Sequence, residues 1–231
     1  MKLSIIITCY NEARTIRENL SKVEAASLPE GTEKEIIIVD DCSTDGSKDM
    51  LKPIEERHRV IYHEKNTGKG GAIRTGLAVA SGDYIVIQDA DLELDPNDLQ
   101  SLMKPLLEGK ADLVLGSRFL DRPMNFYNKS YLKYFLANRG ITTAFNFLYF
   151  IWLTDVNCGY KMFISKIGKN LTFEANSFDI EVEILAKVIK GGYHIKEVPV
   201  SYNPRNLEEG KKIRLKHAFM MLSRMLKCRF N

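Results

Sequence analysis

The segment Tyr84-Ile85-Val86-Ile87-Gln88-Asp89-Ala90-Asp91 joins an apolar run to two carboxylates. The run from Tyr84 to Ile87 is short and rich in β-branched residues, which indicates a buried strand that ends at a polar edge. Because alternate side chains of a strand point to the same side, Asp89 and Asp91 can face one ligand. Hard cations such as Mg²⁺ bind carboxylate oxygens together with substrate phosphates. The segment therefore predicts a divalent metal site, although an acidic turn after a strand is more often a solvated loop.

The hydrophobic period switches repeatedly between strand and helix on both sides of this segment. Strands are expected at 3–8, 35–40, 60–63, 84–88, 112–116, 160–164 and 193–201. Helices are expected at 12–25, 45–57, 68–80 and 96–107, with starts at Asp45 and Pro96. Strands that alternate with helices favour a doubly wound α/β fold with a mostly parallel sheet. Such a sheet binds its ligands at the carboxyl ends of the strands.

Composition limits the class of protein. The chain has 231 residues, of which 45% are hydrophobic and 27% charged, so it can bury a full core and is not a disordered chain. The net charge of +3 is modest, and we expect no nucleic-acid partner. Cysteines at 9, 42, 158 and 228 form no close pair, which argues against a thiolate metal site and favours a reduced compartment. The apolar run at 3–7 is too short for a signal peptide, and no stretch long enough to span a membrane is free of charge.

Three more polar clusters stand at expected strand ends, at 8–12, 39–47 and 66–71. Asp45 and Ser47 read as a capped helix start. The adjacent acids Asp40 and Asp41 would repel each other unless a donor such as a base N–H or a ribose hydroxyl shares the site, so capping and ligand binding both stand as interpretations there. The glycine-rich turn at 66–71 lacks the spacing of a P-loop. Its backbone N–H groups and Lys69 could still meet a phosphate.

Taken together, the motifs resemble family 2 glycosyltransferases of the GT-A fold, and are closest to the branch of dolichol- or polyprenyl-phosphate sugar synthases. The motifs that occur in the family's order are Tyr10-Asn11-Glu12, Asp40-Asp41, Ser43-Thr44-Asp45-Gly46-Ser47, Asn66 with Gly68-Lys69-Gly70, Asp89-Ala90-Asp91 and Gly116-Ser117-Arg118-Phe119. The likeness continues through 154–161, through an acidic helix at 178–187 that includes Glu183, and through 197–205. It covers about residues 3–216. The loop 208–212 differs in spacing from the branch's Gly-Glu-Ser-Lys form. Lys211 and Lys212 are therefore alternative candidates for the functional lysine.

The resemblance implies an inverting hexosyltransferase that uses GDP-mannose or UDP-glucose with Mn²⁺ or Mg²⁺ held by Asp89 and Asp91. The residues that it assigns to donor binding are Tyr10, Asn11, Glu12, Asp40, Asp41, Lys69, Asp89, Ala90 and Lys212. It assigns catalysis to Asp91, Asp155 and Arg205, and binding of the acceptor to Arg118 and Arg139. The loop 203–212 follows the last expected strand, carries Arg205, Lys211 and Lys212, and includes Gly210 as a hinge, so we expect it to close over the donor.

The implied acceptor is a polyprenyl or dolichyl phosphate, which is ionised near neutral pH and needs no strong general base. A saccharide hydroxyl is the alternative acceptor, and it would require a base, for which Asp155 is the first candidate. The third interpretation is a nucleotide-sugar-binding protein without catalysis. Intact Asp89, Asp91, Asp155 and Arg205 count against this third interpretation.

Two segments bear on the membrane. One is a stripe at helical spacing, which is more often core than membrane contact; it consists of Tyr131, Tyr134, Ile141, Phe145, Leu148 and Trp152. The other is the tail 211–231, which holds seven Lys and Arg and no Asp or Glu. A basic amphipathic helix of this kind lies on anionic lipid or docks on its own domain.

We therefore expect a cytoplasmic protein, peripheral to the membrane on its cytosolic face, with a membrane-anchoring subunit as the other route to the surface. The expected organisation is a single domain over 1–231. Within it we distinguish a nucleotide-sugar-binding half at 1–116, an acceptor half at 117–210 and the tail helix at 211–231.

Overall fold

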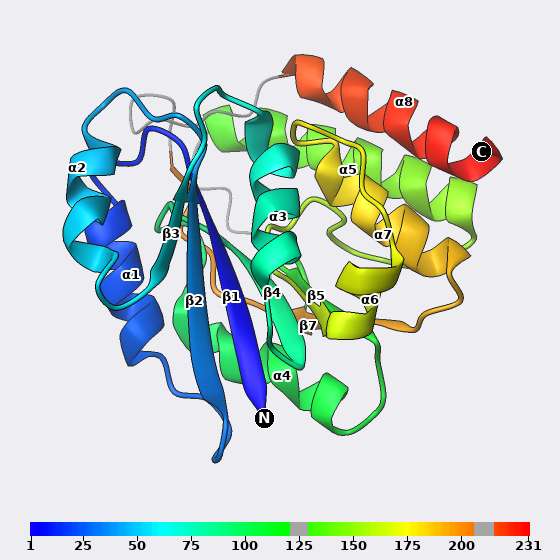
Figure 1. Ribbon diagram of the computed structural model, residues 1–231. Helices are drawn as coiled ribbons and strands as arrows, with labels where there is room; N and C mark the ends of the chain where they lie inside the picture. Colours follow the sequence, from blue (N-terminus) through cyan, green and yellow to red (C-terminus); the bar gives the residue numbers. More distant parts are fainter. Residues whose placement is uncertain (121–128, 206–214) are drawn as a thin grey trace.

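The computed structural model describes residues 1–120, 129–205 and 215–231 (Figure 1). Its centre is a seven-stranded sheet of order β3-β2-β1-β4-β6-β5-β7. The strands are β1 (Lys2–Cys9), β2 (Glu33–Asp40), β3 (Arg59–Tyr62), β4 (Tyr84–Asp89), β5 (Leu113–Ser117), β6 (Lys161–Ile164) and β7 (Ile195–Pro199). Every strand expected from the sequence is present, with ends that differ by no more than two residues. The central strand β1 is buried on both faces, since Ile5, Ile6 and Ile7 have no exposed surface.

The sheet is parallel except at β6. Strands β1 to β4 pair in parallel, as do β5 and β7, whereas β6 runs antiparallel to both β4 and β5. The expectation of a mostly parallel sheet is confirmed, with this one exception. The register places Lys161, the first residue of β6, opposite Ile87 near the end of β4. The chain thus enters β6 from the edge where β4 ends, and the segment that precedes β6 lies beside Asp89.

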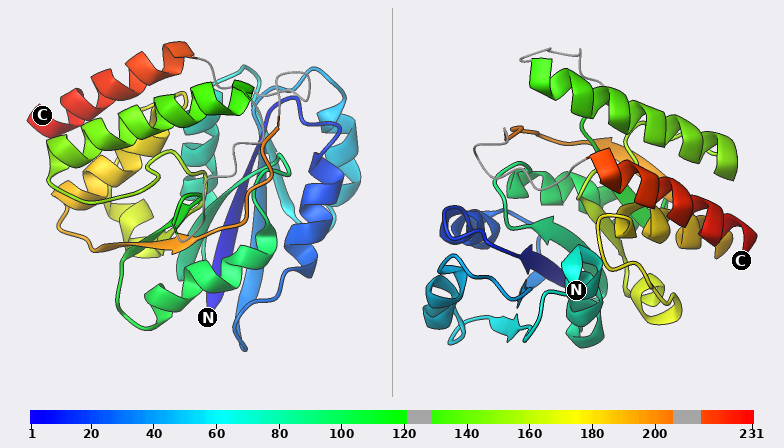
Figure 2. Two further views of the ribbon diagram at one scale, coloured as in Figure 1. Left: turned by 180° about the vertical axis from the view of Figure 1, so that it is seen from behind. Right: turned by 90° about the horizontal axis from the view of Figure 1, so that it is seen from above.

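Helices cover both faces of the sheet (Figures 1 and 2). They are α1 (Ile16–Ala25), α2 (Ser47–Leu51), α3 (Gly68–Val79), α4 (Leu99–Leu107), α5 (Lys129–Tyr149), α6 (Ser165–Asn170), α7 (Ile180–Lys190) and α8 (Leu215–Phe230), with short 3₁₀ turns at Lys52–Ile54 and Pro96–Asp98. Helices α3 and α6 lie on one face, and α1 and α4 lie on the other. Helices α5 and α8 run side by side beyond α7.

The expected helix at 45–57 is shorter than predicted. Helix α2 ends at Leu51 and gives way to a 3₁₀ turn that contains Pro53, because proline has no N–H for the helical ladder. The Asp45 carboxylate accepts the N–H and the hydroxyl of Ser47 at 3.0 and 2.6 Å. The interpretation of Asp45 and Ser47 as a capped helix start is correct for the contact between them and wrong for the cap itself, because the N-cap residue of α2 is Gly46 and makes no side-chain capping bond.

The two segments considered for the membrane divide their apolar residues between the core and the surface. In α5, Ile141 and Phe145 are buried, as a core stripe requires, but Trp152 beyond its end is 88% exposed. In α8, Met221 and Met225 are buried, while Phe219 is 76% exposed. The core interpretation is thus correct for the middle of the stripe and wrong for Trp152. Within the described ranges, no helix is long and apolar enough to cross a membrane.

Candidate active site

A cavity of about 570 Å³ opens at the carboxyl ends of β1 and β4, a size typical of small-molecule sites. The residues predicted from the sequence that line it are Tyr10, Glu12, Asp41, Lys69, Asp89, Ala90, Asp91, Arg118 and Arg205. Among the other predicted residues, Asn11, Asp40, Asp155 and Arg139 are not part of its lining. Lys211 and Lys212, and most of the loop predicted to close over the donor, lie outside the described residues.

The two acids at the end of β4 each meet a cation from a distant part of the chain. Lys69 Nζ lies 2.6 Å from Asp89 Oδ1, and Arg205 Nη2 lies 2.6 Å from Asp91 Oδ2. Arg205 also binds Glu12 through Nη1, at 2.9 Å, and its backbone N–H donates to Glu93 at 3.0 Å. The guanidinium of Arg205 thus stands among three carboxylates from three segments of the chain.

Burial and crowding shift the pKa values of this acidic centre. Burial, followed by the negative charges of Asp89 and Glu93, raises the pKa of Asp91 to about 7. Burial alone would lower the pKa of Lys69, but the charges of Asp89 and Glu181 outweigh it, so the net pKa of Lys69 is raised. Around Asp91, carboxylates therefore outnumber the positively charged side chains. An excess of negative charge of this kind favours binding of a cation.

The donor set fits a hard divalent ion carried in with a substrate. Within 1–120, 129–205 and 215–231, no three His, Cys, Asp or Glu side chains are arranged as a ready-made metal cluster. Asp89 and Asp91 supply oxygen ligands, and Mg²⁺ commonly uses one or two such carboxylates and takes its remaining ligands from phosphates and water. Lys69 contacts Oδ1 of Asp89 and Arg205 contacts Oδ2 of Asp91, so an ion bound by these carboxylates would share their charge with the two cations.

Gly68 and Gly70, in the first turn of α3, pack closely against the backbone at 175–176. An added Cβ at Gly68 would lie 2.1 Å from the carbonyl oxygen of Asn176, and one at Gly70 would lie 2.0 Å from that of Ala175. The N–H of Gly68 donates to Asp41 at 2.7 Å and that of Gly70 to Asn176 at 3.0 Å. The expectation that these two backbone groups meet a phosphate is therefore wrong, whereas Lys69 between them does line the cavity.

Asp41 holds the start of α3. Its carboxylate accepts the N–H and the hydroxyl of Thr67 at 2.7 and 2.8 Å and faces His63 Nδ1 at 2.7 Å. Asp41 thus binds the start of α3 and not that of the helix after its own turn, and its position in the lining also leaves it within reach of a ligand. Asp40 is fully buried, and one of its oxygens accepts the N–H of Ser43 at 3.0 Å.

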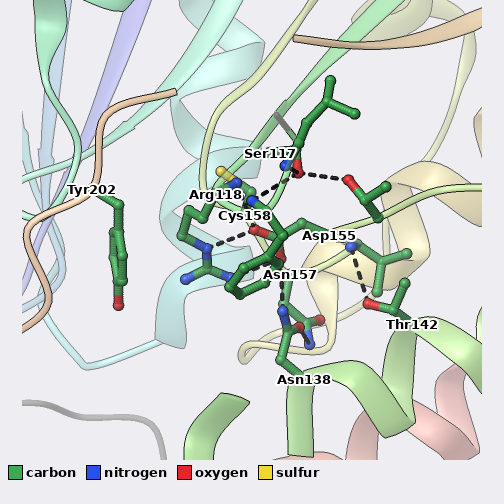
Figure 3. Close-up of polar contacts among 12 residues, drawn as sticks. Ser117, Arg118, Asn138, Thr142, Asp155, Asn157, Cys158 and Tyr202 are labelled. Atoms are coloured by element: carbon green, nitrogen blue, oxygen red, sulfur yellow. Dashed lines mark hydrogen bonds and ion pairs between the residues drawn. The ribbon is translucent and has the colours of Figure 1, made fainter. Parts of the chain in front are cut away.

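Arg118 and Asp155 form a buried ion pair at the other side of the cavity (Figure 3). Arg118 Nε lies 2.6 Å from Asp155 Oδ2 and Nη2 lies 2.8 Å from Oδ1. Asn138 of α5 donates to the same Oδ1 at 2.8 Å. The Tyr202 ring lies 4.9 Å from the guanidinium carbon. Both oxygens of Asp155 are engaged in these contacts. Its role in the structure is therefore to hold Arg118 in place at the cavity.

Arg139 stands apart from this cluster. It is exposed on α5, next to the buried Asn138 that contacts Asp155. The prediction that Arg118 and Arg139 together bind an acceptor is supported by position for Arg118 alone.

Sequence reasoning missed several residues of the lining, among them Glu93, Asn157, Glu181, His217 and Met221. The acidic helix was noted for Glu183, but the carboxylate of Glu183 accepts the N–H groups of Glu174 and Ala175 instead. Both Glu181 and Glu183 lie in the first turn of α7, where an acid is favoured by the helix dipole, so no signal in the sequence singles out Glu181.

Comparisons with known proteins agree with this geometry. A family model described as "Glycosyl transferase family 2" matches residues 4–171. The chain is 31% identical to the dolichyl-phosphate beta-glucosyltransferase of Saccharomyces cerevisiae, over 87% of this chain and 66% of that protein. It is 29% identical to the dolichol-phosphate mannosyltransferase of Pyrococcus furiosus, over 91% of this chain and 59% of that protein. These relatives agree with the resemblance to dolichol- and polyprenyl-phosphate sugar synthases.

The fold is shared with a solved enzyme. The crystal structure of glucosyl-3-phosphoglycerate synthase from Mycobacterium tuberculosis in complex with Mn²⁺, UDP and phosphoglyceric acid matches 99% of this chain and 78% of that chain. The TM-score is 0.71 at 21% sequence identity. The expectation of a GT-A α/β fold is confirmed, and the chain belongs to glycosyl transferase family 2.

Proposed function

We propose that the protein transfers a hexose from GDP-mannose or UDP-glucose to a polyprenyl or dolichyl phosphate at a membrane surface, with the aid of Mn²⁺ or Mg²⁺. The observation that carries the proposal is that one cavity joins the acids of β4 and Lys69 to the guanidinium groups of Arg118 and Arg205. Guanidinium groups match phosphate geometry well. The two relatives named for transfer to dolichyl phosphate support this acceptor class.

The residues of the cavity divide the work between donor and acceptor. Asp89 and Asp91 would hold the metal, which when bound supplies positive charge to the leaving diphosphate. Lys69 contacts Asp89 and so lies where it can neutralise the same phosphates. Arg118, fixed by Asp155, presents its guanidinium to the acceptor phosphate. An ionised phosphate oxygen then attacks the anomeric carbon, and the nucleoside diphosphate departs with inversion.

The engagement of Asp155 counts against a saccharide hydroxyl as the acceptor. That reaction needs a carboxylate to take the hydroxyl proton, and Asp155 was the first candidate for it. Both of its oxygens are occupied by Arg118 and Asn138, and its side chain is fully buried.

The surface of α5 and α8 supports a peripheral encounter with lipid. The large apolar residues exposed on or just beyond these helices are Leu132, Leu136, Phe147, Phe150, Trp152, Phe219, Met220, Leu222, Leu226 and Phe230. The two helices lie side by side (Figure 2). Helix α8 also contributes Met221 to the lining of the cavity. A lipid-facing surface and the reaction site would thus share one helix.

The test is a panel of nucleotide sugars incubated with the protein, Mn²⁺ and a short polyprenyl phosphate. The expected result is sugar recovered in the lipid fraction with one nucleotide sugar, and none when EDTA replaces Mn²⁺. Sugar transferred to an oligosaccharide but not to the lipid phosphate would overturn the acceptor. Nucleotide binding without any transfer would overturn the reaction.

A further inference from the structure

A chain of alternating charges runs from the centre of the sheet to the cavity. Lys161 of β6 is fully buried and contacts Glu181 of α7. The other oxygen of Glu181 lies 2.7 Å from Lys69 Nζ, and Lys69 Nζ lies 2.6 Å from Asp89 Oδ1. The order is therefore ammonium, carboxylate, ammonium, carboxylate, and only the last three groups line the cavity within the described part of the chain.

Glu181 occupies the middle of this chain and fixes both of its neighbours. A buried ammonium is costly unless it is paired, so Lys161 holds Glu181 in place as much as Glu181 holds Lys161. Lys161 Nζ also donates to the carbonyl of Cys158 at 2.6 Å. It thereby ties down the segment that carries Asn157, another residue of the lining.

We propose that Glu181 is a positioning residue that keeps Lys69 directed at the donor diphosphate, an inference that rests on the proposed function. In the structure, Lys69 is shared between Asp89 and Glu181. If Asp89 binds a metal, its hold on the Lys69 ammonium would weaken, because its charge would be shared with the ion. Glu181 is anchored by Lys161 and would retain its contact with Lys69. The ammonium group would then keep its place in the lining of the cavity.

The primary test is binding of UDP and of GDP, each with Mn²⁺, measured by calorimetry on Glu181→Gln. We expect about a tenfold loss of affinity for the nucleotide that the wild type binds, at the low end of what loss of a charged contact costs. Glu183→Gln is the matched control, because Glu183 is buried on the same helix but binds the backbone N–H groups of Glu174 and Ala175, and none of these three residues lines the cavity. We expect this control to lower Tm and to leave nucleotide affinity unchanged.

A double-mutant cycle tests whether the effect passes through Lys69. Glu181→Gln added to Lys69→Met should weaken nucleotide binding little beyond Lys69→Met alone, since the residue to be positioned is already gone. If Glu181→Gln does not fold, Lys161→Met/Glu181→Gln removes the buried pair together, and the same loss of affinity is expected.

The outcomes separate this inference from the function on which it rests. A folded Glu181→Gln variant that binds nucleotide as the wild type does would overturn the inference alone, as would additive losses in the cycle. Wild-type protein that binds neither UDP nor GDP would overturn the proposed function, and the inference with it.

Discussion

The Arg205 guanidinium lies 2.6 Å from the Asp91 carboxylate across a sequence separation of 114 residues. Asp91 stands in the predicted metal site, so a side chain of the protein itself supplies the positive charge there. The contact has two consequences: Arg205 stabilises the acids of the ligand-free protein, and a metal ion bound at Asp91 would compete with it for the charge of the same carboxylate. Stability and metal binding are thus linked through one side chain.

The first prediction concerns Arg205→Met. Arg205 and Asp91 are partly buried, and loss of a charged hydrogen bond costs about 1.5–3 kcal/mol, so the unfolding temperature in EDTA should fall by about 5 °C. Because Mn²⁺ can replace the lost charge, Mn²⁺ should raise the Tm of this variant more than it raises the Tm of the wild type. Arg205→Lys is the control that keeps the charge. Equal stabilisation of all three proteins by Mn²⁺ would contradict the competition.

The second prediction concerns the paired acids. Asp91→Asn, and with it Asp89→Asn, should abolish metal-dependent turnover while the protein stays folded, since both acids lie at a strand end and not in the apolar core. Mn²⁺ affinity in the presence of nucleotide, measured by calorimetry, should fall about tenfold or more. Full activity of the double variant in metal-free buffer would rule out the metal site.

The third prediction compares Arg118 with Arg139. Arg118→Ala should raise the acceptor KM or lower kcat by about ten- to a hundredfold with little change in donor binding, because a charged hydrogen bond is worth about 1.5–3 kcal/mol. Arg139 is exposed and outside the cavity lining, so Arg139→Ala should change acceptor kinetics less. Initial rates at varied acceptor and donor concentrations decide the matter. A larger acceptor effect at Arg139 than at Arg118 would reverse the assignment.

The fourth prediction compares glycine-to-alanine substitutions at two positions with positive φ, in order to separate the steric cost of an added Cβ from its conformational cost. Gly68 has a φ of +80° and no room for a Cβ, whereas Gly109 has a φ of +64° and open space around it. Gly109→Ala should therefore cost about 1 kcal/mol in unfolding free energy, and Gly68→Ala about 3 kcal/mol or more. Urea denaturation of the two variants measures both costs. Similar values would mean that the segment at Asn176 yields easily.

The fifth prediction concerns the exposed apolar surface. Because Met221 and Met225 of α8 are buried, deletion of the tail would damage the fold, and surface substitutions are the cleaner test. Serine at Phe147, Phe150 and Trp152 should weaken co-sedimentation with anionic liposomes. Serine at Leu107, which is exposed at the end of α4, should leave it unchanged. Binding should also weaken at high salt, since basic residues contribute about 1 kcal/mol each near an anionic leaflet. Unaltered binding of the triple variant would place the contact elsewhere.

Local patterns were enough to predict the strands and the position of the acids at the end of β4, because the burial and the two-residue period of a strand can be recognised from consecutive residues. The direction of β6 could not be predicted, since the run 160–164 reads the same way in either orientation. The pairing of Arg118 with Asp155 spans 37 residues and depends on how α5 and the following loop pack. Glu181 and Glu183 are two residues apart on a helix, about 200° around its axis. Which of them faces the cavity is settled only when α7 docks.

The antiparallel strand β6 makes the two functional parts of the chain inseparable. It lies between β4 and β5, so the part of the sheet at which we propose that the donor binds is completed by a strand from the later part of the chain. A fragment that stopped at residue 116 would leave β4 and β5 with an unfilled gap between them. Exchange of the region after residue 116 between relatives would replace an internal strand as well as the acceptor-side residues. New acceptor preferences are therefore expected to arise by point substitution around a fixed sheet rather than by modular recombination.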